Sequence, residues 1–245
     1  MTDVTEDRFL GGRVRVRQPA RGFRSGLDAV MLAAAVPARA GDEVLELGSG
    51  AGVASLCLAA RVTGCNIIGA EYDSGLVALA NENASLNSVS PQVHFVEADV
   101  LSLPRALRKG FDHVFCNPPF HGDGGTHSPD EQRARALHDR KHLGHWLSAG
   151  FKRTASGGTF TAIVRADRLN EALAALPAVG IAVLPLWPKR GEAAKRTIVQ
   201  VHKDARTPLK LLAGLSLHKP NGKYTADADA ILREGAALVI GDSRG

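Results

Sequence analysis

Apolar and polar positions along the chain change their spacing repeatedly, and this predicts short buried strands separated by helices. Residues 43–47, 66–71 and 93–96 are short apolar runs bounded by turn residues, which is typical of buried strands. The segments between them, 53–61 and 74–86, have the length and spacing of helices. The same reading predicts further strands at 13–17, 111–116, 159–164, 181–186 and 197–202, and further helices at 27–36, 134–153 and 167–176.

Alternation of strands and helices favours an α/β fold in which helices cover both faces of a mostly parallel sheet. The strands at 181–186 and 197–202 flank a basic turn and are expected to pair as a hairpin. We see no repeat and no linker, so we predict a single domain over 1–245. An N-terminal extension (about 1–40) and a C-terminal appendage (about 203–245) would belong to it.

Composition agrees with a chain that folds around a large core. Of 245 residues, 44% are hydrophobic, and no apolar run approaches the roughly 20 residues of a membrane span. The first seven residues are acidic and polar, unlike a signal peptide. Three scattered cysteines show no metal-binding or disulfide spacing and are typical of a reducing compartment. We therefore expect a cytoplasmic protein with no membrane partner.

Positive charge is concentrated in two segments, although the net charge is only +5. The first segment carries six arginines before the acid Asp28: Arg8, Arg13, Arg15, Arg17, Arg21 and Arg24. The second carries seven cations: Lys189, Arg190, Lys195, Arg196, Lys203, Arg206 and Lys210. Clusters of this kind suit a polyanion such as RNA, although a solvated surface would have the same composition.

The stretch 111–120 predicts a strand that ends in a stiff corner. Pro118 and Pro119 fix their own backbone and lack donors, and Asn117 is pushed out of the helical region because a proline follows it. The Asn117 side chain and the neighbouring carbonyls then point out of the corner. Such an arrangement can hold a planar group that carries an amine.

A glycine-rich turn follows the first strand of the predicted sheet. Residues 46–52 read E-L-G-S-G-A-G, in which the glycines allow a tight turn and close backbone approach to a ligand. The dinucleotide fingerprint does not fit, because its third glycine would fall on Val53. Glu71 and Asp99 end the next two strands, where an acid can bind ribose or base groups. Asp73 precedes a helix and is expected to cap it instead.

The E-L-G-S-G-A-G turn resembles the first motif of the S-adenosylmethionine-dependent methyltransferases. The resemblance implies a Rossmann-like class I methyltransferase fold with a seven-stranded sheet, and S-adenosylmethionine as cofactor. It also implies that glycines and backbone of the turn hold the amino acid part of the cofactor, with Glu46 near its ammonium, and that Asp99 contacts the adenine amine. The expected cofactor-binding residues are Gly26, Asp28, Glu46, Gly48, Ser49, Gly50, Gly52, Glu71, Tyr72, Ala98, Asp99 and Asn117.

Asn117-Pro118-Pro119-Phe120 resembles the (N/D)PP(Y/F) signature of methyltransferases that modify planar amines. An amine of this kind is a poor nucleophile, because its lone pair is delocalised. Hydrogen bonds to Asn117 Oδ1 and to the Pro118 carbonyl would localise the lone pair and direct it at the methyl group. Phe120 would stack on the base. These four residues are the expected catalytic set.

Two flanking segments are similar to bacterial tRNA adenine-N6 methyltransferases that act on adenosine 37 of a valine tRNA. One runs over residues 22–32, which places Gly26 and Asp28 by the cofactor, and the other over 217–225. Phe120-His121 instead resembles enzymes that methylate guanine N2 in ribosomal RNA. Methylation of a protein glutamine and a non-catalytic RNA-binding role are the further alternatives. The histidines His138, His142 and His145 lack a completing ligand, so no metal is expected.

Overall fold

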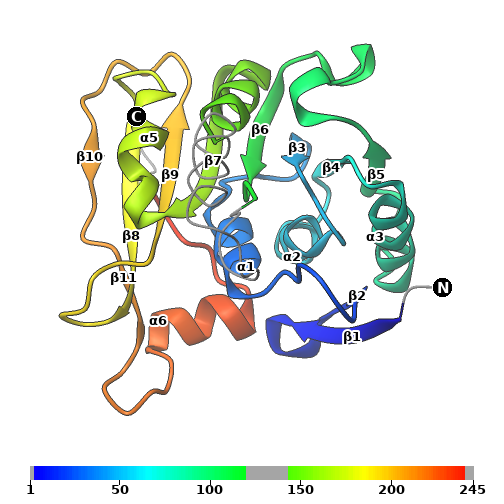
Figure 1. The fold of residues 1–245 in the computed structure, drawn as a ribbon, viewed down its shortest axis with the longest axis horizontal. Coiled ribbons are helices and arrows are strands. Elements are labelled where there is room, and N and C mark those ends of the chain that lie inside the picture. Colours follow the sequence, from blue (N-terminus) through cyan, green and yellow to red (C-terminus); the bar gives the residue numbers. More distant parts are fainter. Residues whose placement is uncertain (1–2, 120–142, 241–245) are drawn as a thin grey trace, which may run out of the picture.

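The computed structural model describes residues 3–119 and 143–240, and a nine-stranded sheet lies at the centre (Figure 1). Its order is β10-β8-β9-β7-β6-β3-β4-β5, and β11 also pairs with β8. The strands are β3 Glu43–Leu47, β4 Asn66–Glu71, β5 Val93–Glu97, β6 Phe111–Cys116, β7 Thr154–Arg165, β8 Ile181–Lys189, β9 Arg196–His202, β10 Lys210–Leu211 and β11 Leu215–His218. The predicted mostly parallel sheet of seven strands is confirmed, with two short strands added beside β8.

Most neighbouring strands in this sheet are parallel, and β9 is the exception. It runs antiparallel to β7 and to β8, so the predicted hairpin of 181–186 and 197–202 is confirmed. The central strands are buried on both faces, which is why they read as continuous apolar runs. β7 begins at Thr154, five residues before the prediction, because Ser156, Gly157 and Gly158 interrupt the apolar run at a register shift.

Helices cover both faces of the sheet, as predicted. On one face α1 Leu27–Ala35, α2 Val53–Arg61 and α3 Ser74–Leu86 contribute to one apolar cluster. On the other face a helix described over 143–153 and α5 Leu169–Ala174 contribute to a second cluster. Of the helix predicted over 134–153, residues 134–142 lie outside the described residues. None of the described helices has both the length and the apolar character needed to cross a membrane.

Both ends of the chain pack against the first of these clusters. The N-terminal extension forms an antiparallel hairpin of β1 Val4–Phe9 and β2 Val14–Pro19. Only β2 was predicted, because the charged residues of β1 hide its alternation. The C-terminal appendage adds α6 Ala226–Asp229, which continues into a π-helical turn over Ala230–Glu234.

The direction of the sheet connections reverses between β3 and β6. The chain passes from β3 outward through β4 to β5, and then returns to pair β6 with the other side of β3. Parallel sheets bind ligands at such a reversal, beyond the carboxyl ends of the strands. We call the edge at which β3, β4, β5 and β6 end the carboxyl edge.

Candidate active site

The register of the sheet brings the main predicted site residues together along the carboxyl edge. Leu47 pairs with Cys116 on one side and with Ala70 on the other, so Gly48 lies between Asn117 and Glu71. Glu71 in turn pairs with Glu97, two residues before Asp99. Since neighbouring strands are about 4.8 Å apart, the row from Asn117 to Asp99 spans on the order of 15 Å.

The three glycines of the turn have left-handed backbone conformations but different surroundings. A Cβ on Gly48 would lie 2.5 Å from the Trp146 ring, and one on Gly52 would lie 2.6 Å from the Phe95 ring. A Cβ on Gly50 would meet no atom within 4 Å. Gly48 and Gly52 are therefore required by packing, whereas Gly50 faces open space where a ligand can approach.

The amide groups of this turn are largely engaged within the protein. Gly48 N and Ser49 N both donate to the Ala70 carbonyl, at 2.7 and 3.2 Å. Gly50 N donates to Glu71 Oε2 at 2.9 Å. The resemblance implies that the backbone of this turn holds the cofactor; the structure uses these three amides to fix the turn against β4, which leaves side chains and carbonyls to contact a ligand.

Glu71 is held by backbone donors on both carboxylate oxygens. Besides Gly50, the amides of Tyr72 and Asp73 donate to Oε1 at 2.8 and 3.0 Å. A carboxylate offers about four acceptor positions, so three are in use. A ribose hydroxyl can take the fourth position, and a second hydroxyl would replace one of the amides.

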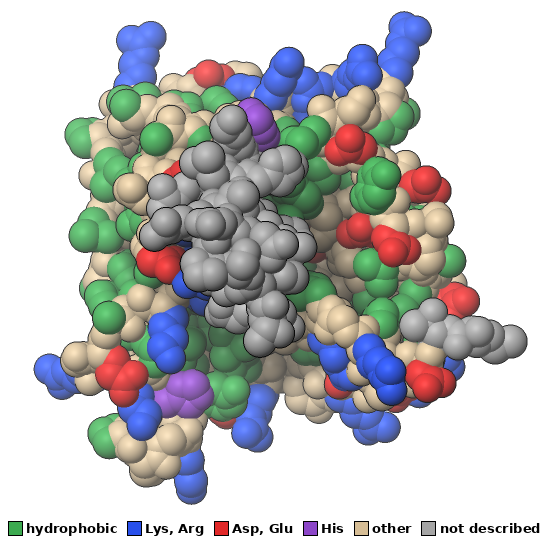
Figure 2. Space-filling view, in the orientation of Figure 1, with side chains coloured by type: hydrophobic (Ala, Val, Ile, Leu, Met, Phe, Trp, Pro, Cys, Tyr) green, Lys and Arg blue, Asp and Glu red, His purple; other side chains and the backbone are tan. Residues whose placement is uncertain are grey.

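Acidic side chains surround the β5 end of the row. Figure 2 shows Asp and Glu side chains gathered over β4 and β5, and Glu97 and Asp99 are exposed there. Asp99 Oδ1 accepts from Leu101 N at 2.8 Å and caps the short helix Val100–Ser102. Ala98 beside it is buried, whereas Tyr72 is 76% exposed. Asp73 caps α3 through Gly75 N and Leu76 N, as predicted.

Glu46 lies behind the glycine turn and is almost fully buried. Its Oε2 accepts from Ser55 N at 3.1 Å and from Ser55 Oγ, both in the first turn of α2. Burial raises the pKa of Glu46 from 4.5 to about 8, although these hydrogen bonds act in the opposite direction. An apolar environment disfavours the ionised carboxylate. A cation close to Glu46 would favour the ionised form, and the two charges would then attract each other.

Two buried polar atoms at the carboxyl edge have no hydrogen-bond partner within the described ranges. They are Asn117 Oδ1 and Ser49 Oγ. Leaving such an atom unpaired costs on the order of 1–3 kcal/mol, so each is a site at which a ligand donor would be stabilising. Pro118 is buried beside Asn117 and holds the corner rigid, and Pro119 is exposed. Phe120, the remaining predicted catalytic residue, lies outside the described residues.

Gly26 and Asp28 lie at the start of α1, where Gly26 is the N-cap residue. Asp28 Oδ2 forms an ion pair with Arg196 Nε at 2.8 Å, at the start of β9. This pair ties α1 to the antiparallel strand β9, and Asp28 serves that contact in this structure. A role for either residue at the cofactor stays a prediction.

Two side chains that shape this site were missed in the sequence. Trp146 lies against Gly48 from the helix at 143–153. Asn83 on α3 is fully buried and donates to the Ala51 carbonyl of the glycine turn at 3.0 Å. A single tryptophan and a mid-helix asparagine carry no motif, and only the contacts assign them. His145 is exposed, and the described residues contain no group of His, Cys, Asp and Glu arranged for a metal; His138 and His142 are outside them.

The residues present fit S-adenosylmethionine in their chemistry. Glu71 can bind a ribose hydroxyl, Asp99 keeps one carboxylate oxygen for an amine, and Glu46 would be stabilised by an ammonium. Gly50 leaves space for close approach, and Ser49 Oγ is an unpaired polar group. These groups form a row that can bind an elongated ligand with an amino acid at one end and a nucleoside at the other.

Comparisons with known proteins identify methyltransferases as the relatives of this chain. Residues 26–135 match the family model described as "Methyltransferase small domain". The chain is 27% identical over 220 residues to a Shewanella baltica tRNA1(Val) (adenine(37)-N6)-methyltransferase, covering 87% of this chain and 92% of that protein. The Bacteroides thetaiotaomicron protein of the same name is 28% identical over 209 residues, with 82% and 87% covered.

Solved structures show the same fold. A predicted O-methyltransferase from Agrobacterium tumefaciens superposes with a TM-score of 0.73 at 26% identity, covering 86% of this chain and 98% of that one. A Thermus thermophilus 16S rRNA N2 methyltransferase, solved with AdoMet and guanosine, gives a TM-score of 0.57 at 19% identity. That match covers 82% of this chain and 50% of the other, and it supports the fold alone.

Proposed function

We propose that this chain, an S-adenosylmethionine-dependent methyltransferase, methylates an exocyclic amine of an RNA base, with adenine N6 in tRNA as its substrate. The observation that carries the proposal is the position of Asn117. It follows β6 at the reversal of the sheet, next to Gly48, and its Oδ1 is buried without a partner among the described residues. An amine N–H is the donor that this oxygen lacks.

S-adenosylmethionine is the cofactor, and when bound it supplies a methyl group on a positively charged sulfur. We assign Gly50, Ser49 and Glu46 to its amino acid end, Glu71 to the ribose and Asp99 to the adenine. Tyr72 and Ala98 flank these two acids in the sequence. With these assignments, the amino acid end would lie beside Asn117, because Gly48 lies next to Asn117 along the carboxyl edge.

Asn117 Oδ1 and the Pro118 carbonyl each accept one N–H of the substrate amine. Two acceptors out of the base plane draw the lone pair away from the ring and hold it toward the methyl group. The same acceptors stabilise the positive charge that develops on the nitrogen. Because the two prolines hold this corner rigid, the geometry exists before the substrate binds. The extra proton leaves to solvent after transfer.

The relatives support tRNA, and adenine 37 of a valine tRNA, as the substrate. Proteins named for that activity align with this chain over most of their length. The basic segments of the sequence suit an RNA partner, and such a substrate would place the enzyme in the cytoplasm. Phe120 would stack on the base. Guanine N2 of ribosomal RNA is the second candidate, because Phe120-His121 follows the two prolines.

The test is transfer of labelled methyl from S-adenosylmethionine to a valine tRNA transcript, followed by nucleoside analysis. We expect N6-methyladenosine, and no product when adenosine 37 is replaced by guanosine. N2-methylguanosine formed in ribosomal RNA would support the second candidate instead. Labelling of a glutamine-containing protein, with no labelling of any RNA, would contradict both.

Asn117→Ala tests the catalytic corner in the same assay. Loss of an acceptor that acts in the transition state should lower kcat by about 10²–10³-fold. Affinity for S-adenosylmethionine, measured by calorimetry, should stay within about threefold of the parent value. Loss of cofactor affinity together with turnover would mean that Asn117 has a structural role only.

A further inference from the structure

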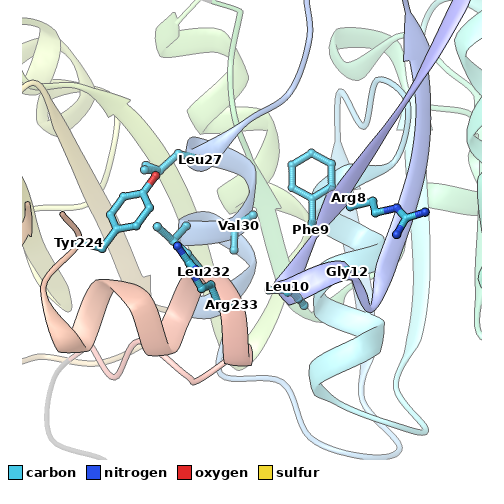
Figure 3. Close-up of a pocket in the computed structure, with 10 residues that line it drawn as sticks. Arg8, Phe9, Leu10, Gly12, Leu27, Val30, Tyr224, Leu232 and Arg233 are labelled. Atoms are coloured by element: carbon cyan, nitrogen blue, oxygen red, sulfur yellow. The ribbon is translucent and has the colours of Figure 1, made fainter. Parts of the chain in front are cut away.

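A concave site whose lining includes none of the residues assigned at the carboxyl edge lies between the two ends of the chain (Figure 3). It is a pocket of about 500 Å³ between the turn of the N-terminal hairpin, the first turns of α1 and the C-terminal appendage. Neither the cofactor nor the target base uses it in the function proposed above. We call it the terminal groove.

The terminal groove has apolar and aromatic walls. Leu27 and Val30 of α1 line it, and Phe9 and Tyr224 stand on opposite sides (Figure 3). The Tyr224 ring is stacked on His218, with centroids 4.8 Å apart and planes at 27°. His218 Nδ1 donates to the Pro188 carbonyl at 3.1 Å, which fixes both rings. A pre-ordered aromatic wall of this kind suits a planar base.

Cations lie at the margins of the groove, and none of the described residues that line it is acidic. Arg233 contributes from the π-helical turn; its ion pair with Asp229 is an exposed i,i+4 contact at 2.8 Å, which is a weak interaction. Arg8 also lines the groove, and its guanidinium turns outward to the exposed face of the hairpin (Figure 3). The cations beside the groove are therefore Arg233 at its rim and Arg8 on the adjoining face of the hairpin.

The exposed face of the hairpin extends this positive region. Cross-strand pairing sets Arg8 opposite Arg15 and Glu6 opposite Arg17, so three arginines share this face with one acid. Glu6 is committed to Arg15 through two hydrogen bonds of 3.0 and 2.9 Å, whereas Arg8 lies 4.0 Å away and its side chain is 70% exposed. Figure 2 shows Lys and Arg side chains over β1 and β2, in contrast to the acidic β4 and β5 region.

The hairpin is connected to the carboxyl edge by hydrogen bonds. Gln18 at its end exchanges hydrogen bonds with Ser25 N and the Ser25 carbonyl, immediately before α1 begins. Asn83 joins the Arg17 backbone to the glycine turn through Ala51. These bonds hold the hairpin in a fixed position relative to the glycine turn.

We propose that the terminal groove binds a second nucleotide of the substrate RNA, with its base between Phe9 and Tyr224 and its phosphates at Arg8 and Arg233. The proposal rests on the proposed RNA substrate. Charge favours RNA as the occupant, because the groove lining and the hairpin face together hold four arginines, Arg8, Arg15, Arg17 and Arg233, against one acid that is already paired. Aromatic walls supply binding that does not depend on the identity of the base.

The experiment measures binding of a fluorescent valine tRNA transcript to the full chain by anisotropy over a range of salt concentrations. We expect Arg8→Gln/Arg233→Gln to weaken binding about tenfold at 100 mM salt and to reduce the slope of log affinity against log salt by about 1–2, as the loss of one or two phosphate contacts predicts. The charge-matched control is Arg105→Gln/Lys152→Gln, whose positions belong to the elements on the other face of the sheet. The control should change affinity less than twofold.

Phe9→Leu tests the base site separately, because leucine keeps the apolar volume and removes the stacking surface. It should weaken tRNA binding at least fivefold and leave the salt slope unchanged. Calorimetric affinity for S-adenosylmethionine and the thermal midpoint should match the parent for every variant, which excludes misfolding as the cause.

Equal affinities and salt slopes in the groove variants and the control would overturn the proposal that the groove binds RNA. Absence of tRNA binding by the parent chain would also overturn it. Binding is read independently of turnover, so the two proposals can fail separately. A parent chain that binds tRNA through the groove without methylating any RNA would retain the groove and reject the catalytic proposal.

Discussion

At the carboxyl edge, the function of a polar side chain depends on whether its oxygens already accept hydrogen bonds from neighbouring residues. Asn117 Oδ1 has no partner within the described residues, whereas Glu71 is bonded to three amides. An unpaired buried oxygen binds a donor with little competition, and a paired carboxylate is held in a fixed position. We therefore expect Asn117 to act on the reacting amine and Glu71 to position the cofactor.

Glu46 makes the stability of the protein depend on pH. Its folded-state pKa is raised from 4.5 to about 8, so between these values the unfolded chain releases a proton that the folded protein retains. Stability from this group is highest below pH 4.5 and is lost as pH rises toward 8, by up to about 1.4 kcal/mol per pH unit.

We predict that Glu46→Gln removes this dependence. Between pH 5.5 and 7.5 the parent should lose on the order of 2 kcal/mol of unfolding free energy relative to the variant, measured by urea denaturation. Parallel curves for the two proteins would show that Glu46 is ionised in the fold. S-adenosylmethionine should reduce the difference, because its ammonium favours the ionised carboxylate.

Gly50 and Gly52 are predicted to respond differently to the same substitution. Both need a left-handed backbone, so alanine costs about 1–2 kcal/mol at either position. Gly52→Ala should cost more, because its Cβ would contact the Phe95 ring, whereas the Gly50 Cβ enters open space. Gly50→Ala should mainly weaken cofactor binding. Calorimetry and urea denaturation separate the two effects, and an equal stability loss in both variants would contradict the assignment.

At the scale of elements, α3 connects the N-terminal hairpin to the glycine turn. Asn83 accepts from Arg17 N at 2.8 Å and donates to the Arg17 and Ala51 carbonyls at 2.9 and 3.0 Å. One turn later Asn87 makes the matching pair of bonds to Arg15 but does not reach the glycine turn. Two asparagines four residues apart thus replace strand pairing along the edge of β2 that does not pair with β1.

Asn83→Ala should destabilise the protein by roughly 2–4 kcal/mol, because it leaves buried backbone groups unpaired. It should also weaken S-adenosylmethionine binding, since the Ala51 carbonyl loses its donor. Asn87→Ala is the matched control and should loosen the hairpin while keeping cofactor affinity. Thermal unfolding and calorimetry measure both quantities. Equal cofactor affinity in the two variants would contradict a link between hairpin and turn.

At the scale of the whole molecule, both termini pack against the same apolar cluster. Leu10 in the hairpin turn and Ile231 in the appendage are buried in the cluster that contains α1 and α2. The Gly11 backbone approaches the Arg233 carbonyl so closely that a Cβ would lie 2.9 Å from it. Leu238 N donates to the Ala34 carbonyl at the end of α1. Extension, core and appendage should therefore unfold together.

The two tryptophans allow this to be tested. Trp146 reports on the glycine turn, and Trp187 on β8 donates to the Ala213 carbonyl in the appendage. Each of the variants Trp146→Phe and Trp187→Phe keeps one tryptophan. In each variant we expect the fluorescence transition in urea to coincide with the circular dichroism transition, and we expect the two variants to unfold at the same midpoint. If the two variants had different fluorescence midpoints but the same circular dichroism midpoint, the chain would contain parts that unfold independently.

The sequence by itself determined the fold class and most of the residues assigned to the site. The limits of β3, α2, β4 and α3 match the predicted ranges, because apolar spacing reflects burial on a strand or on one side of a helix. The glycine turn and Asn117-Pro118-Pro119 were identified because backbone conformation limits which residues fit there.

Only the tertiary structure decided what each of these residues touches. It showed that the Trp146 ring packs against Gly48 and that Asp28 pairs with Arg196. It also added β1 and the terminal groove, and it left Asn117 Oδ1 unpaired within the described residues. These contacts join residues far apart in the sequence, such as 28 and 196 or 48 and 146. Local spacing records burial and turns, but contacts between distant segments depend on how the whole chain packs.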